Sequence, residues 1–145
     1  MKSRFEQKVD EFCANGHLEQ YRKLLTRILS DMEAKGVTIS ARYDVEFSNF
    51  EDYDDQAENK RIRISLKNVT VPLDVIWILL HEFGHFLSEK RQPGDNVISR
   101  EEMAWTEADR LFDYYSELAA ERSSYLTCKK CCLNSYYQYE GLPEI

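Results

Sequence analysis

The stretch His81-Glu82-Phe83-Gly84-His85 constrains this 145-residue chain more than any other part of its sequence. Residues four apart lie on the same face of an α-helix, so His81 and His85 can direct two imidazole rings at one metal ion. Glu82, the next residue around the helix, then reaches a water molecule bound to that ion. The spacing HExxH therefore predicts a metal site with a general base beside it.

The flanking residues predict that this stretch is helical. Val71-Pro72-Leu73-Asp74 places a proline near the helix start and a carboxylate in the first turn, where the helix dipole favours negative charge. Every residue over 75–80 is apolar, which is typical of a buried central helix. The sequence predicts a helix over 70–91 that ends before Pro93-Gly94. Histidine and glutamate side chains buried in such a helix need partners, and a metal ion supplies one for all three.

The third metal ligand should be an acidic residue. A catalytic zinc ion takes three protein ligands and leaves one position for water, and no histidine follows His85. We expect the ligand on the next helix, predicted over 99–122, where the candidates are Glu101, Glu102 and Glu107. Ser99 and Glu102 have the spacing of a capping box, which gives Glu102 a structural role. Glu101 is therefore the preferred third ligand, and Glu102 is the alternative.

These two segments together resemble a known family. His81-Glu82-Phe83-Gly84-His85 followed by Glu101-Glu102-Met103-Ala104-Trp105 is similar to the small bacterial and phage zinc peptidases of the ImmA/IrrE type, and more broadly to the gluzincin-like minimal peptidases. Their pattern is HExxH followed by Glu-x-x-Ala on the next helix. The resemblance spans roughly residues 60–120. It implies that His81 and His85 bind Zn²⁺ with Glu101, that Glu82 is the general base, and that an intracellular protein such as a repressor is the substrate.

The chain departs from the family pattern at two points. Family members often carry Asn or Asp after the alanine, where this chain has Trp105. Many members also add a DNA-binding helix-turn-helix, which this sequence does not indicate. Both departures bear on which substrate the protein binds, and neither changes the predicted metal ligands or the predicted general base.

Periodicity and the resemblance together predict an α+β fold in a single domain, residues 1–145. We expect a mostly helical, minimal zincin-like domain with a small antiparallel sheet next to the HExxH helix. The predicted parts are N-terminal helices over 1–36, a small sheet over 37–67, the HExxH helix over 70–91, the ligand helix over 99–122 and a C-terminal extension over 123–145.

Residues 37–47 and 60–66 alternate in hydropathy and predict strands. The second of these has one wet face, which favours a position at the sheet edge. An edge strand beside a peptidase metal can pair with an extended peptide, so Ile62 and Ile64 are candidate substrate-binding residues. An ordinary two-stranded meander is equally well supported. The acidic run over 51–58 lacks the glycine and terminal glutamate of an EF-hand and predicts a solvated loop.

Charge and cysteine content limit the expected partners and compartment. The formal net charge of -7 argues against nucleic acid and anionic membrane as partners, since both bind basic surfaces. No signal peptide or membrane-spanning run is apparent, so we expect a cytoplasmic protein. The four cysteines are then predicted to be reduced thiols, with a second, structural zinc site as the weaker alternative; they are Cys13, Cys128, Cys131 and Cys132.

The expected chemistry is metal-assisted hydrolysis of a peptide bond in a protein or peptide substrate, with Glu82 moving the proton of the attacking water. Tyr114, Tyr115 or an arginine are candidate donors to the tetrahedral intermediate. Two other functions are compatible with the same residues. One is a zinc-bearing module that binds a protein without cutting it. The other is a structural interaction protein that uses the tyrosine-rich C-terminal region as an interface. No motif specifies the substrate sequence or the oligomeric state.

Overall fold

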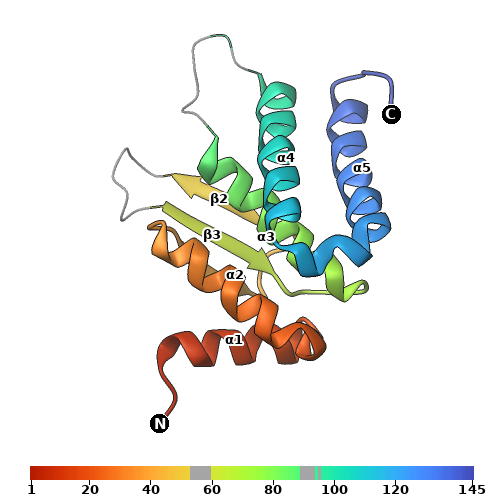
Figure 1. Cartoon of the computed structure of the whole chain (residues 1–145). Helices are drawn as coiled ribbons and strands as arrows, with labels where there is room; N and C mark the ends of the chain where they lie inside the picture. The colour runs from red at the N-terminus through yellow and green to blue at the C-terminus, as the bar shows by residue number, and fades with distance from the viewer. Residues whose placement is uncertain (53–59, 89–93, 95) are drawn as a thin grey trace.

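The chain folds into helices arranged around a small sheet, which is the predicted α+β class (Figure 1). The computed structural model describes residues 1–52, 60–88, 94 and 96–145. The α-helices are α1 (Arg4–Asn15), α2 (Arg22–Ala34), α3 (Pro72–Leu87), α4 (Val97–Tyr114) and α5 (Arg122–Tyr139). The strands are β1 (Thr38–Arg42), β2 (Asn49–Asp52) and β3 (Lys60–Ser65), and the 3₁₀ turns are η1 (Glu19–Tyr21) and η3 (Ser116–Glu121).

The N-terminal helices predicted over 1–36 are confirmed as α1 and α2, which lie beneath the sheet (Figure 1). Ser3 caps α1 by accepting a hydrogen bond from the backbone of Glu6, and α1 ends at Asn15. Gly36 follows α2 with φ of 98°, a left-handed conformation that glycine adopts without strain. The apolar side of α2 is fully buried, so these helices cover the sheet rather than build a site.

The sheet is mixed, so the prediction of an antiparallel sheet is wrong. The strand order is β1-β3-β2, with β1 parallel to β3 and β2 antiparallel to β3. The edge position predicted for 60–66 is also wrong, because β3 is the central strand. The side chains of Ile62 and Ile64 are 0% and 1% exposed. A strand whose apolar side chains are buried in the core is most stable when a neighbouring strand is hydrogen-bonded to it on each side. Arg63, on the other face of β3, pairs with Glu51 of β2 at 2.9 Å, so this charged side chain has a partner although β3 is not an edge strand.

The predicted strand over 37–47 ends early, since β1 stops at Arg42. Tyr43 and Phe47 beyond it are exposed, so the alternation there does not reflect burial against the core. The predicted acidic loop over 51–58 is wrong at its start, because β2 extends to Asp52. The rest of that run lies outside the described residues.

Helix α3 runs through the middle of the molecule, between the sheet and the helices α4 and α5 (Figure 1). It begins at the predicted Pro72, after Val71 in an extended conformation. It ends at Leu87, earlier than predicted, because Ser88 is extended and its backbone and hydroxyl both donate to the carbonyl of Gly84. The predicted stop at Pro93-Gly94 lies partly outside the described residues. No helix in the described part of the chain is long and apolar enough to cross a membrane.

In the region predicted as a ligand helix over 99–122 and a C-terminal extension over 123–145, the structure has two helices, α4 and α5. α4 starts at Val97 with Asn96 as its N-cap, since the Asn96 side chain accepts a hydrogen bond from the backbone of Ser99. The capping box predicted at Ser99 and Glu102 is therefore wrong. α4 ends at Tyr114, before η3, and α5 folds back along α3 and α4. The indole of Trp77 on α3 donates to Ser124 on α5 at 2.9 Å, which ties these helices together.

Candidate metal centre

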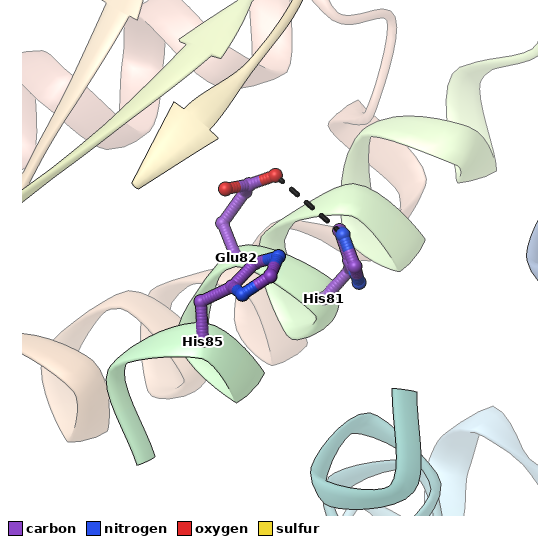
Figure 2. Close-up of side chains that lie close together, drawn as sticks. All are labelled: His81, Glu82 and His85. Atoms are coloured by element: carbon purple, nitrogen blue, oxygen red, sulfur yellow. Dashed lines mark ion pairs between the residues drawn. The ribbon is translucent and has the colours of Figure 1, made fainter. Parts of the chain in front are cut away.

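The two histidines of the HExxH stretch lie on one face of α3, as the spacing predicts. Their rings are 4.7 Å apart between centroids, and the three side chains His81, Glu82 and His85 place one donor atom each within 4.8 Å of one another. Figure 2 shows His81 and Glu82 on one turn of α3 and His85 on the next, with a dashed line joining the carboxylate of Glu82 to the ring of His81. His81 is 6% exposed, and burial lowers the pKa of its imidazole. A neutral imidazole is the form that binds a metal ion.

Glu101 reaches these histidines from α4. Its two carboxylate oxygens lie 2.9 Å from Nε2 of His81 and 3.1 Å from Nε2 of His85. Burial alone would raise the pKa of Glu101, but the two imidazoles lower it to about 2. Glu101 is therefore an anion held against two imidazole nitrogens. Glu82 is farther away, with its Oε1 3.8 Å from Nε2 of His81. For this reason we take Glu101, and not Glu82, as the third donor to a shared cation.

The donor set fits a tetrahedral metal ion. Two imidazoles and one carboxylate are a known ligand set of catalytic zinc, and donors about 2.0–2.1 Å from zinc lie about 3.4 Å from each other in a tetrahedron. The two separations that involve Glu101, 2.9 Å and 3.1 Å, are a few tenths of an ångström shorter than this. Oε2 of Glu101 is also buried without a hydrogen bond of suitable geometry. A cation between the three groups satisfies that oxygen.

Glu82 lies on the other side of the histidines and faces a cavity. Its carboxyl is 6% exposed, and burial raises its pKa to about 7. A carboxyl with this pKa takes up and releases a proton near neutral pH, which is the property a general base needs. In Figure 2 the carboxylate of Glu82 points away from the α4 side. The same cavity is lined by His81, so the water-accessible side of the centre is the side that holds Glu82.

A close contact between α3 and α4 sets the position of Glu101. A Cβ built on Gly84 would lie 2.1 Å from the backbone oxygen of Ala104, so only glycine allows this approach. Ala104 and Ala108 are fully buried, as expected for a helix that packs tightly through small residues. Glu101 lies one turn before Ala104, and the contact therefore brings its carboxylate to the histidines.

Trp105 supports the ring of His81. The two rings are stacked with centroids 4.3 Å apart and planes 22° apart. Nδ1 of His81 is buried without a hydrogen-bond partner, whereas metal-binding histidines usually donate this hydrogen to an acceptor. In this chain the ring of His81 is held by stacking on Trp105, the residue at which the sequence departs from the family pattern.

The remaining candidate ligands lie elsewhere. Glu102 is exposed on α4 and accepts a hydrogen bond from the hydroxyl of Tyr137 at 3.0 Å. Glu107 pairs with Arg110. The structure thus places Glu101 at the histidines and Glu102 away from them, although the capping argument that favoured Glu101 is wrong.

The other predicted site residues are dispersed. Ile62 is in the core, while Ile64 is in the core and also forms part of the cavity wall. Pairing of a substrate with the edge of β3 is not available, because β1 and β2 flank it. Of the candidate donors to the intermediate, Tyr114 is 70% exposed and Tyr115 donates to Asp31 at 2.8 Å.

The cysteines do not form a second metal cluster among the described residues. Cys13 is buried beside α2, and the other three lie on α5. All four are free thiols, as predicted.

Sequence reasoning missed Tyr136. This residue of α5 lines the same cavity as His81 and Glu82, and burial, together with the nearby carboxylate of Glu101, raises the pKa of its hydroxyl to about 12. The hydroxyl is therefore protonated at neutral pH and can donate a hydrogen bond. The helical spacing of Tyr125, Cys128, Leu133 and Tyr137, all buried, is the signal that predicts helix α5, but it does not predict what Tyr136 contacts.

Comparisons of this chain with protein families, with curated proteins and with solved structures found no match. The functional argument therefore depends on the geometry of the site itself.

Proposed function

We propose that this protein is a zinc-dependent peptidase that hydrolyses peptide bonds of a specific protein substrate. The observation that carries the proposal is the convergence of His81, His85 and Glu101 from two helices on one point, with Glu82 beside it at the end of a cavity. Three ligands on one side and a cavity on the other leave a position for water and substrate, as in catalytic zinc sites. A structural zinc site would instead be closed by four protein ligands.

Each residue has a distinct role in the proposed reaction. His81, His85 and Glu101 hold the metal ion. The ion, when bound, supplies a Lewis acid that lowers the pKa of water and polarises the scissile carbonyl. Glu82 accepts the proton of the attacking water and then passes it to the leaving amine, a transfer favoured by its pKa of about 7. The hydroxyl of Tyr136, which lines the cavity together with Glu82, is the candidate donor of a hydrogen bond to the carbonyl oxygen as negative charge develops there.

The same cavity favours catalysis over the two non-catalytic alternatives. A module that only binds a partner has no need of a buried carboxyl whose pKa is raised toward neutrality, because burying that group costs stability. Buried carboxyls with shifted pKa values are more common at catalytic sites than elsewhere.

The deciding experiment compares wild type with Glu82→Gln. Zinc content is measured by atomic emission, and hydrolysis is measured by mapping new N-termini after incubation with a proteome-derived peptide mixture. We expect both proteins to bind one zinc ion, and we expect new termini only with the wild type and only when zinc is present. A Glu82→Gln protein with full turnover contradicts the proposal. A zinc-loaded wild type that produces no new termini favours the protein-binding module.

A further inference from the structure

The cavity beside Glu82 has a volume of about 510 Å³, which is within the range of small-molecule binding pockets. It is bounded by residues 46–48, by the end of β3 and the segment that follows it up to Val71, by the first turns of α3, and by α5. His81 and Glu82 form one end of it. A peptide bond held at the metal centre therefore has an adjoining residue that enters this cavity.

The walls of the cavity are mainly apolar. Ile64 from β3 and Val75 and Ile78 from α3 form the side near the core, and Val75 is 5% exposed. Phe47 and Val71 also line the cavity and are 82% and 46% exposed. An apolar side chain that enters between them removes apolar surface from water on both sides.

The charges around the cavity disfavour an acidic side chain. Asp74 and Glu82 place two carboxyl groups in its lining, and like charges in one pocket repel each other. Among the described lining residues, Lys67 is the single lysine or arginine, and it already pairs with Glu46 at 3.7 Å. A basic side chain could pair with Asp74 or Glu82, so the lysyl probe described below is the necessary comparison.

We infer that this cavity is a specificity pocket for a large apolar side chain, that of the substrate residue next to the scissile bond. This inference rests on the proposed peptidase function. It also gives the substrate a chemical class, an extended peptide segment with a residue such as leucine or phenylalanine beside the cut.

Binding of small zinc-directed probes tests the inference. Three dipeptide hydroxamates that differ only in the side chain next to the hydroxamate, namely leucyl, lysyl and aspartyl, are titrated calorimetrically into the zinc-loaded protein. We expect the leucyl probe to bind at least about 10-fold more tightly than the other two, because its side chain is removed from water. Equal affinities, or tightest binding of the lysyl probe, overturn the inference and leave the zinc site standing. Failure of the protein to bind zinc, in contrast, removes the proposed function itself.

A variant with a larger side chain in the cavity tests whether the preference for the leucyl probe arises there. Ser135 is exposed on α5 and lines the cavity, so Ser135→Phe introduces a ring into it without changing the core. Ser123→Phe makes the same substitution at an exposed position of α5 outside the cavity. We expect Ser135→Phe to reduce the preference for the leucyl probe to less than about 3-fold and to keep zinc affinity, while Ser123→Phe behaves as wild type. A Ser135→Phe protein that keeps the full preference overturns the inference.

Thiol labelling provides a second readout that does not depend on a substitution. Cys131 and Cys132 line the cavity, whereas Cys13 and Cys128 are buried. The leucyl probe should slow alkylation of Cys131 and Cys132 by iodoacetamide several-fold in the zinc-loaded protein. Alkylation rates that do not change when the probe is bound place its side chain elsewhere and overturn the inference.

Discussion

The two sides of α3 differ in how their polar groups are satisfied. Toward α4, the carboxylate of Glu101 contacts His81 and His85, and Gly84 allows the backbones to touch. Toward the cavity, Glu82 is equally buried at 6% exposure, and its Oε1 lies 3.8 Å from Nε2 of His81. Under the proposed function, one side holds the groups that would bind a metal ion, and the other holds the carboxyl that would exchange a proton.

This difference appears directly in the two carboxyl groups. The pKa of Glu101 is lowered to about 2 because the contacts with two imidazoles outweigh burial, whereas burial raises the pKa of Glu82 to about 7. Two carboxyls in one site with pKa values pushed apart are the usual sign of separate roles. A permanent anion suits a metal ligand, and a carboxyl poised near neutrality suits a base.

The largest effect is expected from removing the ligand on the α4 side. Glu101→Gln keeps the size of the side chain but removes its charge, and we expect zinc affinity to fall by more than about 100-fold, because even partners outside the ligand shell contribute 10- to 100-fold. Glu102→Gln, at the next position on α4, should bind zinc as the wild type does. Competition with a chromophoric chelator measures both affinities. If the two variants lose affinity equally, the assignment of Glu101 as the third ligand is wrong.

On the cavity side, Tyr136→Phe should lower kcat without changing zinc affinity. Loss of one hydrogen-bond donor to a developing oxyanion costs about 100- to 1000-fold in kcat. Tyr139→Phe is the matched control on the same helix, since Tyr139 is 87% exposed. Steady-state kinetics on a cleaved peptide separate kcat from KM. A Tyr136→Phe enzyme with wild-type kcat would show that the hydroxyl does not act on the intermediate.

The sequence predicts the α4 side of the site better than the cavity side. His81 and His85 are placed by helical spacing alone, and the face that carries Glu101 is set by its spacing to Ala104 and Ala108. That spacing does not depend on where the helix begins. Assigning the N-cap to Ser99 instead of Asn96 therefore does not change which face of the helix carries Glu101.

The cavity side depends on contacts between distant segments. The alternation over 60–66 predicts a strand but not its neighbours, because arginines on the wet face of a central strand can be satisfied by a partner such as Glu51. The position of Tyr136 depends on how α5 packs on α3, which rests partly on the hydrogen bond from Trp77 to Ser124. Neither arrangement follows from local sequence patterns.

A third prediction concerns the stability of the metal-free protein. Because the pKa of Glu82 is raised from 4.5 to about 7, the folded protein binds a proton more tightly than the unfolded chain does. The free energy of unfolding should therefore fall as pH rises from about 4.5 to 7. Glu82→Gln removes this cost, so we expect it to stabilise the metal-free protein by up to about 3 kcal/mol at pH 8 and by little at pH 4.5.

Urea unfolding in the presence of a chelator at the two pH values measures the effect of Glu82→Gln. Glu140→Gln, at an exposed position after α5, serves as the control and should not change the pH dependence. A Glu82→Gln protein whose stability follows the wild-type pH profile would show that the carboxyl of Glu82 is not held in a water-poor environment.

The smallest effect is expected at the contact between the two helices. In an ordinary helix, alanine in place of glycine stabilises by about 1 kcal/mol. At Gly84 the sign should reverse, because the new Cβ would lie 2.1 Å from the backbone oxygen of Ala104, and backbone cannot move aside as a side-chain tip can. We expect Gly84→Ala to destabilise by about 1–3 kcal/mol, the usual cost of overpacking, and to weaken zinc binding by shifting Glu101 away from the histidines. Urea unfolding and chelator competition measure the two effects together. A gain in stability with unchanged zinc affinity would mean that α3 and α4 do not touch at this point, and the arrangement that places Glu101 at the metal would lose its physical basis.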